Sequence, residues 1–212
     1  MIKFIRNLRL LRYAVMVVRN PDRLENVLAL SQDLSDPSEA QRMLNFYQSY
    51  PETAHALIDK PRLSLQQEPL AFSSNDSLGR RYVAFLSDHG LNPKALDVET
   101  EGRADAYILT HLYETHDLWH VVTGFDTSVA GELGLQAFYA AQSPALFPVA
   151  ILALGLLNTL LFARDDYEQR LDAITKGWTM GRKSKAMFGI AWNDHWNRPL
   201  IDIRQELGIA VS

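Results

Sequence analysis

The chain has 212 residues, 47% of them hydrophobic and 22% charged, and a formal net charge of −4. A chain of this length and composition can bury a substantial core, so we predict one folded domain over residues 1–212. The acidic balance argues against nucleic acid as a partner. The absence of cysteine excludes disulfides, thiol catalysis and cysteine-held metal, so any metal must bind nitrogen and oxygen atoms.

Residues 1–20 form the first predicted element, a basic segment without an acidic residue. Its positive charges are Lys3, Arg6, Arg9, Arg12 and Arg19. Apolar residues lie between these charges, a pattern typical of an amphipathic helix on a membrane surface. The alternative is a first helix whose basic side chains simply face solvent. A secretory signal is not expected, because the segment lacks a long apolar core and a cleavage site.

The chain from residue 22 to the central motif is expected to form helices joined by turns. Asp36-Pro37-Ser38-Glu39 combines an N-cap acid, a first-turn proline and a glutamate at N3, and so predicts a helix start. Gly90 predicts the end of another helix. The expected helices here cover 22–34, 37–50, 53–58 and 78–89, with a loop over 61–75 and a surface turn or short helix over 92–102.

The second half of the chain continues the helical pattern, without the alternation that indicates strands. The expected helices cover 104–122, 129–141, 145–163, 165–178 and 182–196. The fold class that we predict is therefore all-α, a single-domain helical bundle with a cavity that accommodates a lipid.

The segment from Ala145 to Ala163 is the longest apolar run, with only Asn158 and Thr159 polar. Its length is at the threshold for a bilayer-spanning helix, but Pro148 and Gly155 interrupt it. We expect a helix buried in the core. In the alternative, the segment lines a lipid cavity or dips into the membrane interface. Residues expected to contact a lipid tail are Leu154 and Leu157.

Four residues in the central motif have the chemistry of a metal site: His116, Asp117, His120 and Glu132. Positions i and i+4 share one face of a helix, so the two imidazoles can point at a common centre, with Asp117 at its border. Along a continuous helix Glu132 would lie about 18 Å away. The chain must therefore turn back, and Gly124 with the capping residues 126–128 offers the turn. The spacing predicts a helical hairpin with three ligands on one arm and one on the other.

The nature of the metal is left open by these residues. Imidazole favours zinc, iron or copper, whereas carboxylates also accept magnesium and manganese. The unremarkable alternative is a solvated polar helix face near an unrelated glutamate.

The motif H-D-x-x-H, eleven residues, E resembles the signature of the fourth coenzyme Q (ubiquinone) biosynthesis protein family. Flanking stretches are similar too, from Ser77-Leu78-Gly79 and Tyr82 before the motif to a carboxy-terminal block after it. That block contains Gly181-Arg182, Trp192, Trp196, Arg198-Pro199-Leu200 and Arg204 to Ile209. The resemblance spans about residues 36–209, and Trp119 is a large residue at a variable motif position.

This resemblance implies zinc as the most suitable cofactor, and a role in ubiquinone biosynthesis with a polyprenylated lipid or quinone precursor as ligand. The implied reaction is oxidative decarboxylation at ring carbon one of a prenylated hydroxybenzoate, with His116, Asp117, His120 and Glu132 at the catalytic centre. Other implied partners are the membrane surface, further quinone-biosynthesis proteins and a second copy in a homodimer. The implied location is peripheral, on the cytoplasmic side of a membrane or the matrix side of the mitochondrial inner membrane.

Two other functions compete with this one. The protein could be a non-catalytic carrier or scaffold for prenyl lipids with a structural metal. It could also be a metal-dependent hydrolase, either with Asp117 in place of the usual glutamate base or with His89 and Asp165 as further ligands. In the first version aspartate is one methylene shorter than the usual base, and the second version leaves the spaced Glu132 unexplained.

Several residues outside the motif are weaker candidates. Arg182 is the best residue to receive a carboxylate or phosphate head group, and Gln136 and Tyr139 could hydrogen-bond to Glu132 or a ligand. The stripe of Phe188, Trp192 and Trp196 is more typical of core packing. The remaining histidines are expected to be structural or at the surface: His55, His89, His111 and His195.

Overall fold

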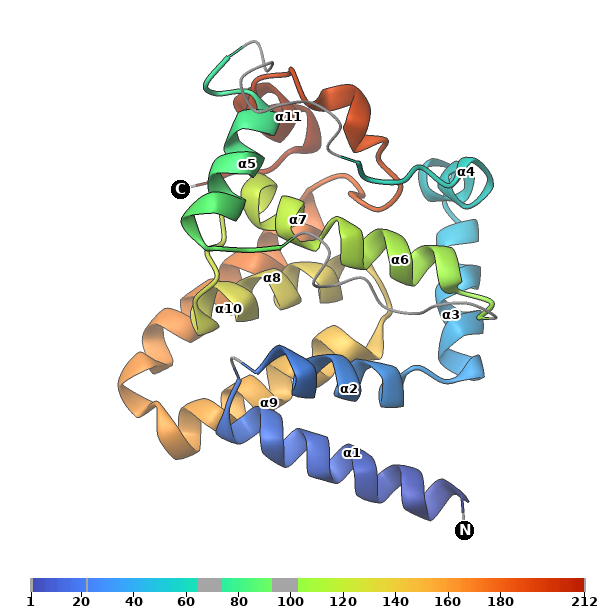
Figure 1. Cartoon of the computed structure of the whole chain (residues 1–212), viewed down its shortest axis with the longest axis vertical. Coiled ribbons are helices and arrows are strands. Elements are labelled where there is room, and N and C mark those ends of the chain that lie inside the picture. The colour runs from blue at the N-terminus through green and yellow to red at the C-terminus, as the bar shows by residue number, and fades with distance from the viewer. Residues whose placement is uncertain (1, 22, 65–73, 93–102, 212) are drawn as a thin grey trace. The chain divides into compact units, whose positions relative to one another are not determined.

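The computed structural model describes residues 2–21, 23–64, 74–92 and 103–211, with side chains from residue 7 onward (Figure 1). In these ranges every regular element is a helix, and the only β feature is an isolated bridge between Ser77 and Pro199. The all-α prediction is therefore confirmed. Most of the expected loop over 61–75 and of the element over 92–102 lies outside the described residues.

The chain divides into two compact units that interleave along the sequence. Unit 1 comprises residues 1–42 and 126–182, and unit 2 comprises residues 43–125 and 183–212. The expectation of one domain over the whole chain stays a prediction.

Unit 1 is built on α1, α2, α8, α9 and α10, with the first part of α3. Their bounds are Ile2–Arg19 for α1, Leu24–Leu34 for α2, Pro37–Gln48 for α3, Val129–Gln142 for α8, Leu146–Phe162 for α9 and Tyr167–Lys183 for α10. Helices α1, α2 and α9 pack against one another, and α9 also packs against α8 (Figure 1). The predicted start of α3 is confirmed, since Asp36 Oδ1 accepts from the backbone N–H groups of Ser38 and Glu39.

A buried polar network joins three helices of unit 1. The Arg170 guanidinium on α10 is 4% exposed and donates to Asn158 Oδ1 at 2.6 Å and to Thr159 Oγ1 at 3.0 Å, both on α9. Asn158 Nδ2 in turn donates to the Val18 carbonyl on α1 at 2.7 Å. These bonds satisfy the only polar side chains of the apolar α9 segment, and they fix where α1 crosses it.

The expectation that 145–163 is a core helix is wrong for most of its surface. The exposed large apolar residues of α9 are Leu146, Val149, Leu156, Leu157, Leu160, Leu161 and Phe162. Only the face carrying Pro148, Gly155, Asn158 and Thr159 is buried. A Cβ at Gly155 would come within 2.3 Å of Leu133 Cδ2, so α8 and α9 are in tight contact there. Within the described residues, no helix is long and apolar enough to cross a membrane.

Unit 2 places α7 against three neighbours. Its helices are α4 at Pro51–Asp59, α5 at Leu78–Asp88, α6 at Ala106–Glu114, α7 at His116–Thr123 and α11 at Leu200–Leu207, together with the end of α3. Helices α5, α6 and α11 all contact α7. Ser77 Oγ caps α5, and its end before Gly90 is confirmed, because Gly90 adopts the left-handed φ of 61°.

The structure corrects two sequence-based predictions in unit 2. The expected helix 104–122 is two helices, α6 and α7, which meet at Thr115. The expected helix 182–196 is also wrong. α10 continues to Lys183, an irregular segment follows, and only Trp192–His195 forms a short 3-10 turn, η3. Phe188, Trp192 and Trp196 are nevertheless buried, so their role in core packing is confirmed.

Candidate metal centre

Helix α7 carries three of the four predicted metal ligands and is fixed at its carboxyl end. Gly124 closes the helix with a left-handed φ of 78°, as its place after the motif predicts. Arg204 of α11 donates from Nε to the Val122 carbonyl at 2.9 Å and from an η nitrogen to the Val121 carbonyl at 2.8 Å. A cation at this position also complements the negative end of the helix dipole.

The two histidines of α7 lie close together, and the neighbours of His120 fix its ring. Their ring centroids are 4.9 Å apart and the rings are nearly perpendicular. His120 is 1% exposed, and its Nδ1 lies 3.1 Å from the Phe125 carbonyl. A carbonyl only accepts, so Nδ1 carries the proton and Nε2 keeps its lone pair for a metal. Phe85 of α5 stacks on the His120 ring at 5.6 Å, which fixes its plane.

Glu132 occupies the first turn of α8, where the local sequence sets its position. Ser128 Oγ accepts from Gly131 N at 3.1 Å, so the predicted cap for a second helix is confirmed. Ser128 also donates from its hydroxyl to Asp126 Oδ1. A Cβ at Gly131 would lie 2.2 Å from Asp126 O, so only glycine fits this turn. Gly131 is thus required by the close approach of Asp126 in this turn.

His116, His120 and Glu132 form a group that could hold a metal ion. Each offers one ligand atom, and these atoms all lie within 4.8 Å of one another. Within the described part of the chain, this group does not include Asp117. Asp117 follows His116 directly on α7, and its predicted role as a fourth ligand stays a prediction.

Tyr82 and Glu114 add electrostatic detail around the motif that sequence reasoning missed. Tyr82 on α5 is 1% exposed and stacks on Trp196. Burial first, and then the carboxylates of Asp117 and Glu114, raise the pKa of Tyr82. Its phenol is therefore protonated at neutral pH. The only sequence signal was the place of Tyr82 in the stretch that resembles the family, which assigned it no role.

The residues predicted to contact lipid lie in varied surroundings. Gln136 and Tyr139 are buried on α8, Leu154 is half-buried and Leu157 is 42% exposed on α9, and Arg182 is exposed on α10. Their roles stay predictions.

The histidines expected to be structural or at the surface are placed accordingly. His55 and His89 are exposed, and His195 is half-buried. His111 is buried, and its Nε2 accepts from Gly189 N at 3.1 Å.

The fold and the three ligand residues define an all-α protein with a candidate metal centre of two histidines and one glutamate. Residues 2–212 match the family model described as Coenzyme Q (ubiquinone) biosynthesis protein Coq4, and the chain belongs to this family. The resemblance inferred from the motif is thereby confirmed, and the family implies a role in ubiquinone biosynthesis.

Curated relatives agree with this assignment. The chain is 28% identical to the mitochondrial ubiquinone biosynthesis protein COQ4 of Paracoccidioides lutzii, over 92% of this chain and 70% of the relative. It is 29% identical to the protein of the same name from Aspergillus terreus, over 92% and 69%. A crystal structure from Nostoc punctiforme has a TM-score of 0.83 at 23% identity and covers 97% of this chain and 99% of its own, which supports the fold.

Proposed function

We propose that this protein binds a divalent metal, with zinc preferred, through His116, His120 and Glu132, and acts there on a polyprenylated hydroxybenzoate in ubiquinone biosynthesis. The observation that carries the proposal is the ligand group itself, found in a chain that belongs to the Coq4 family. The reaction is the replacement of the carboxyl group on ring carbon one by a hydroxyl group.

The three residues fit a metal of this kind. Zinc binds imidazole nitrogen and carboxylate oxygen at about 2.0–2.2 Å in a tetrahedral arrangement, so its ligand atoms lie about 3.3–3.6 Å from one another. The three candidate ligand atoms lie within 4.8 Å of one another, so the side chains would have to close by up to about 1.5 Å around zinc. Three protein ligands also leave a coordination position for a substrate group, as catalytic zinc sites do.

Each side chain has a part in this proposal. A bound divalent cation would supply Lewis-acid charge for a carboxylate. His120 is oriented by the Phe125 carbonyl, and Tyr82 offers a protonated phenol next to Asp117 as a hydrogen-bond donor. Exchanging carboxyl for hydroxyl is a two-electron oxidation. Dioxygen accepts four electrons, so it balances this step together with oxidation of the resulting hydroquinone to the quinone. The other products are carbon dioxide and water.

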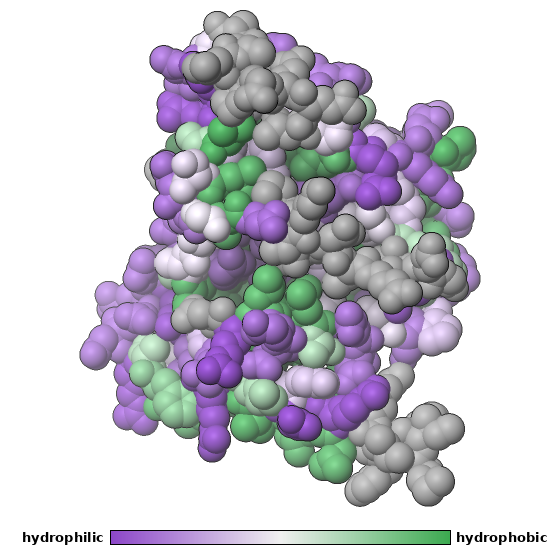
Figure 2. Space-filling view, in the orientation of Figure 1, coloured by the Kyte–Doolittle hydropathy of each residue, from purple (hydrophilic) through white to green (hydrophobic). Residues whose placement is uncertain are grey.

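The exposed apolar residues on the outer surface of unit 1 favour the proposal that the protein binds a membrane surface. Leu8, Leu11 and Val15 are exposed at helical spacing on α1, which packs against the apolar α9. Figure 2 shows apolar and polar surface alternating along the lower margin, over α1. We propose that this surface of unit 1 contacts lipid, with Leu154 and Leu157 of α9 near the prenyl tail.

The metal assignment is tested by elemental analysis of purified protein. We expect about one divalent metal per chain, and its near-complete loss in His116→Ala and His120→Ala. His55→Ala, an exposed histidine in the same unit, is the matched control and should keep the metal. Unchanged metal content in both motif variants would overturn the site.

A non-catalytic carrier with a structural metal is the second candidate, and the exposed apolar face of α9 favours it. Incubation of metal-loaded protein with a geranylated 4-hydroxybenzoate labelled in the carboxyl group separates the two. Release of labelled carbon dioxide that depends on dioxygen and on His120 supports the enzyme. Retention of the intact ligand under all conditions supports the carrier.

A further inference from the structure

Helix α8 presents three different faces within unit 1. One face packs on α10, where a Cβ at Gly177 would lie 1.9 Å from the Gly134 carbonyl oxygen. A second face packs on α9 through Leu133. The third face is polar. It carries Glu132, Gln136, Tyr139 and Ser143, which the helical period places in one row.

Gln136 stands out in this row because its acceptor oxygen is buried without a partner. The residue is 7% exposed, and Oε1 makes no hydrogen bond to any described residue. A buried acceptor of this kind destabilises a fold, so native proteins rarely keep one without use. It lies four residues after Glu132, a rise of about 6 Å along the helix.

Other polar side chains near the end of the same helix are satisfied. Gln142 Nε2 donates to the Gly181 carbonyl at 2.9 Å, and the Ser143 hydroxyl donates to the Tyr139 carbonyl at 3.2 Å. Local packing on α8 can therefore provide partners for polar groups. The unpartnered oxygen of Gln136 lies instead one turn from the candidate ligand Glu132.

We propose that Gln136 Oε1 accepts a hydrogen bond from a ring hydroxyl of the ligand bound at the metal centre, and so selects phenolic substrates. This inference rests on the proposed function and adds the group that the protein recognises. An acceptor needs a donor, so the ligand must carry an O–H at this end of the ring.

Recognition of this type gives strong selection. A site built to accept a hydrogen bond disfavours an analogue without the donor, because the acceptor is left buried and unpaired. Removing the acceptor should therefore abolish selectivity while leaving the metal in place. It should also remove the destabilising effect of the unpaired oxygen on the ligand-free protein.

The experiment compares Gln136→Met, which keeps length and volume, with Gln142→Met, the satisfied glutamine on the same helix. Each metal-loaded protein is titrated with a geranylated 4-hydroxybenzoate and with the same compound lacking the hydroxyl group. We expect the native chain to bind the phenol at least about tenfold more tightly than the analogue. We expect Gln136→Met to bind both equally, with unchanged metal content and an unchanged or higher melting temperature. Gln142→Met should keep the selectivity and melt at a lower temperature.

Two results would overturn the inference. If Gln136→Met keeps the preference for the phenol, or melts lower with its binding unchanged, the glutamine is structural and the metal proposal stands alone. If the native chain binds neither metal nor phenol, the proposed function and this inference both fail.

Discussion

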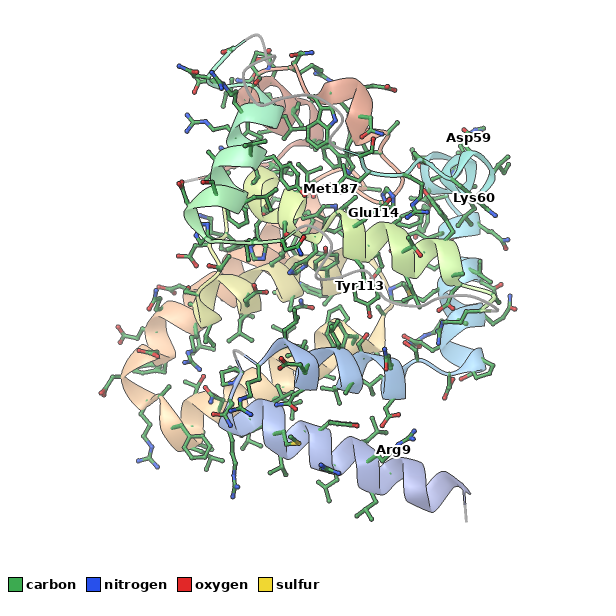
Figure 3. All side chains as sticks on the ribbon, in the orientation of Figure 1. Arg9, Asp59, Lys60, Tyr113, Glu114 and Met187 are labelled. Carbon is green, nitrogen blue, oxygen red and sulfur yellow. The ribbon has the colours of Figure 1, made fainter. Side chains whose placement is uncertain are left out.

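Glu114 shows how single residues fix the chain beside the motif. Its carboxylate accepts from Arg62 Nε at 2.8 Å and from Leu63 N at 2.9 Å (Figure 3). Burial alone would raise the pKa of Glu114. His111, Arg62 and Leu63 outweigh that effect, so the pKa lies below its usual range. The charged form is therefore the one that stabilises the fold.

We expect Glu114→Gln to lower the free energy of unfolding at pH 7 by about 1–2 kcal/mol, because charge-assisted hydrogen bonds are lost. A depressed carboxyl pKa contributes stability above the unfolded value of about 4.3, and that contribution is lost as pH falls through the folded pKa. The difference between the two proteins should thus shrink below about pH 4.3. Denaturant titrations at several pH values measure this difference, and Glu52→Gln, at an exposed position, is the control. A difference that does not change with pH would show that the charge is not responsible.

At the scale of elements, α7 depends on a residue from α11. Arg204 donates hydrogen bonds to two carbonyl groups in the last turn of α7. These carbonyls have no helical N–H partner, because the helix ends there. Its place in the family-like block gave no hint of this contact, because the two helices are far apart in sequence. The metal ligands of α7 are thus oriented by a contact outside the motif.

Arg204→Met should lower the free energy of unfolding by about 2–3 kcal/mol and metal affinity by about 10–100-fold. Arg81→Met is the matched control. Arg81 pairs with the exposed Asp76, and an exposed pair contributes little. Metal titration followed by denaturant unfolding measures both effects. If both variants lose the same stability and metal affinity, the hydrogen bonds from Arg204 to the end of α7 are not what stabilises the site.

The helices predicted well from sequence are those whose ends are set locally. Asp36 caps α3, Ser128 caps α8, and Gly90 and Gly124 end α5 and α7, all through contacts within a few residues. The break at Thr115 gave no such signal, since it contains neither glycine nor proline and its φ of −97° and ψ of 0° stay near helical values. Residues 184–191 have a helical pattern but form instead contacts that are distant in sequence, such as Gly189 with His111.

The candidate site was predictable in the same uneven way. The pairing of His116 and His120 follows from helix period, and the approach of Glu132 follows from the turn between the helices. Their assignment as metal ligands also rested on the acidic residues and on the spacing that resembles the family. The buried state of Gln136 and the tautomer of His120 could not be predicted. Both depend on which atoms of the folded chain surround the side chain, and the sequence does not specify these atoms.

At the scale of the whole molecule, unit 1 combines exposed apolar residues with positive charge. Arg12 and Arg19 are exposed on α1, whereas Arg9 is held to Asp33 of α2 at 2.6 Å (Figure 3). The network of Asn158 and Arg170 keeps α1 in place on α9. This arrangement of apolar side chains beside arginine suits a surface that contains anionic lipid.

The double variant Leu157→Glu/Leu160→Glu tests this proposal. The two leucines are 42% and 59% exposed on α9, so charge there should leave the fold and the metal content intact. Each leucine transferred into lipid contributes about 1.5–3 kcal/mol, so the variant should sediment with phosphatidylglycerol-containing vesicles at least tenfold less than the native chain. Ile201→Glu, at a 57% exposed position on α11 in unit 2, is the control and should bind as the native chain does. Binding should also weaken with salt, because exposed charges are screened. Equal sedimentation of both variants and the native chain would exclude α9 as the lipid-facing surface.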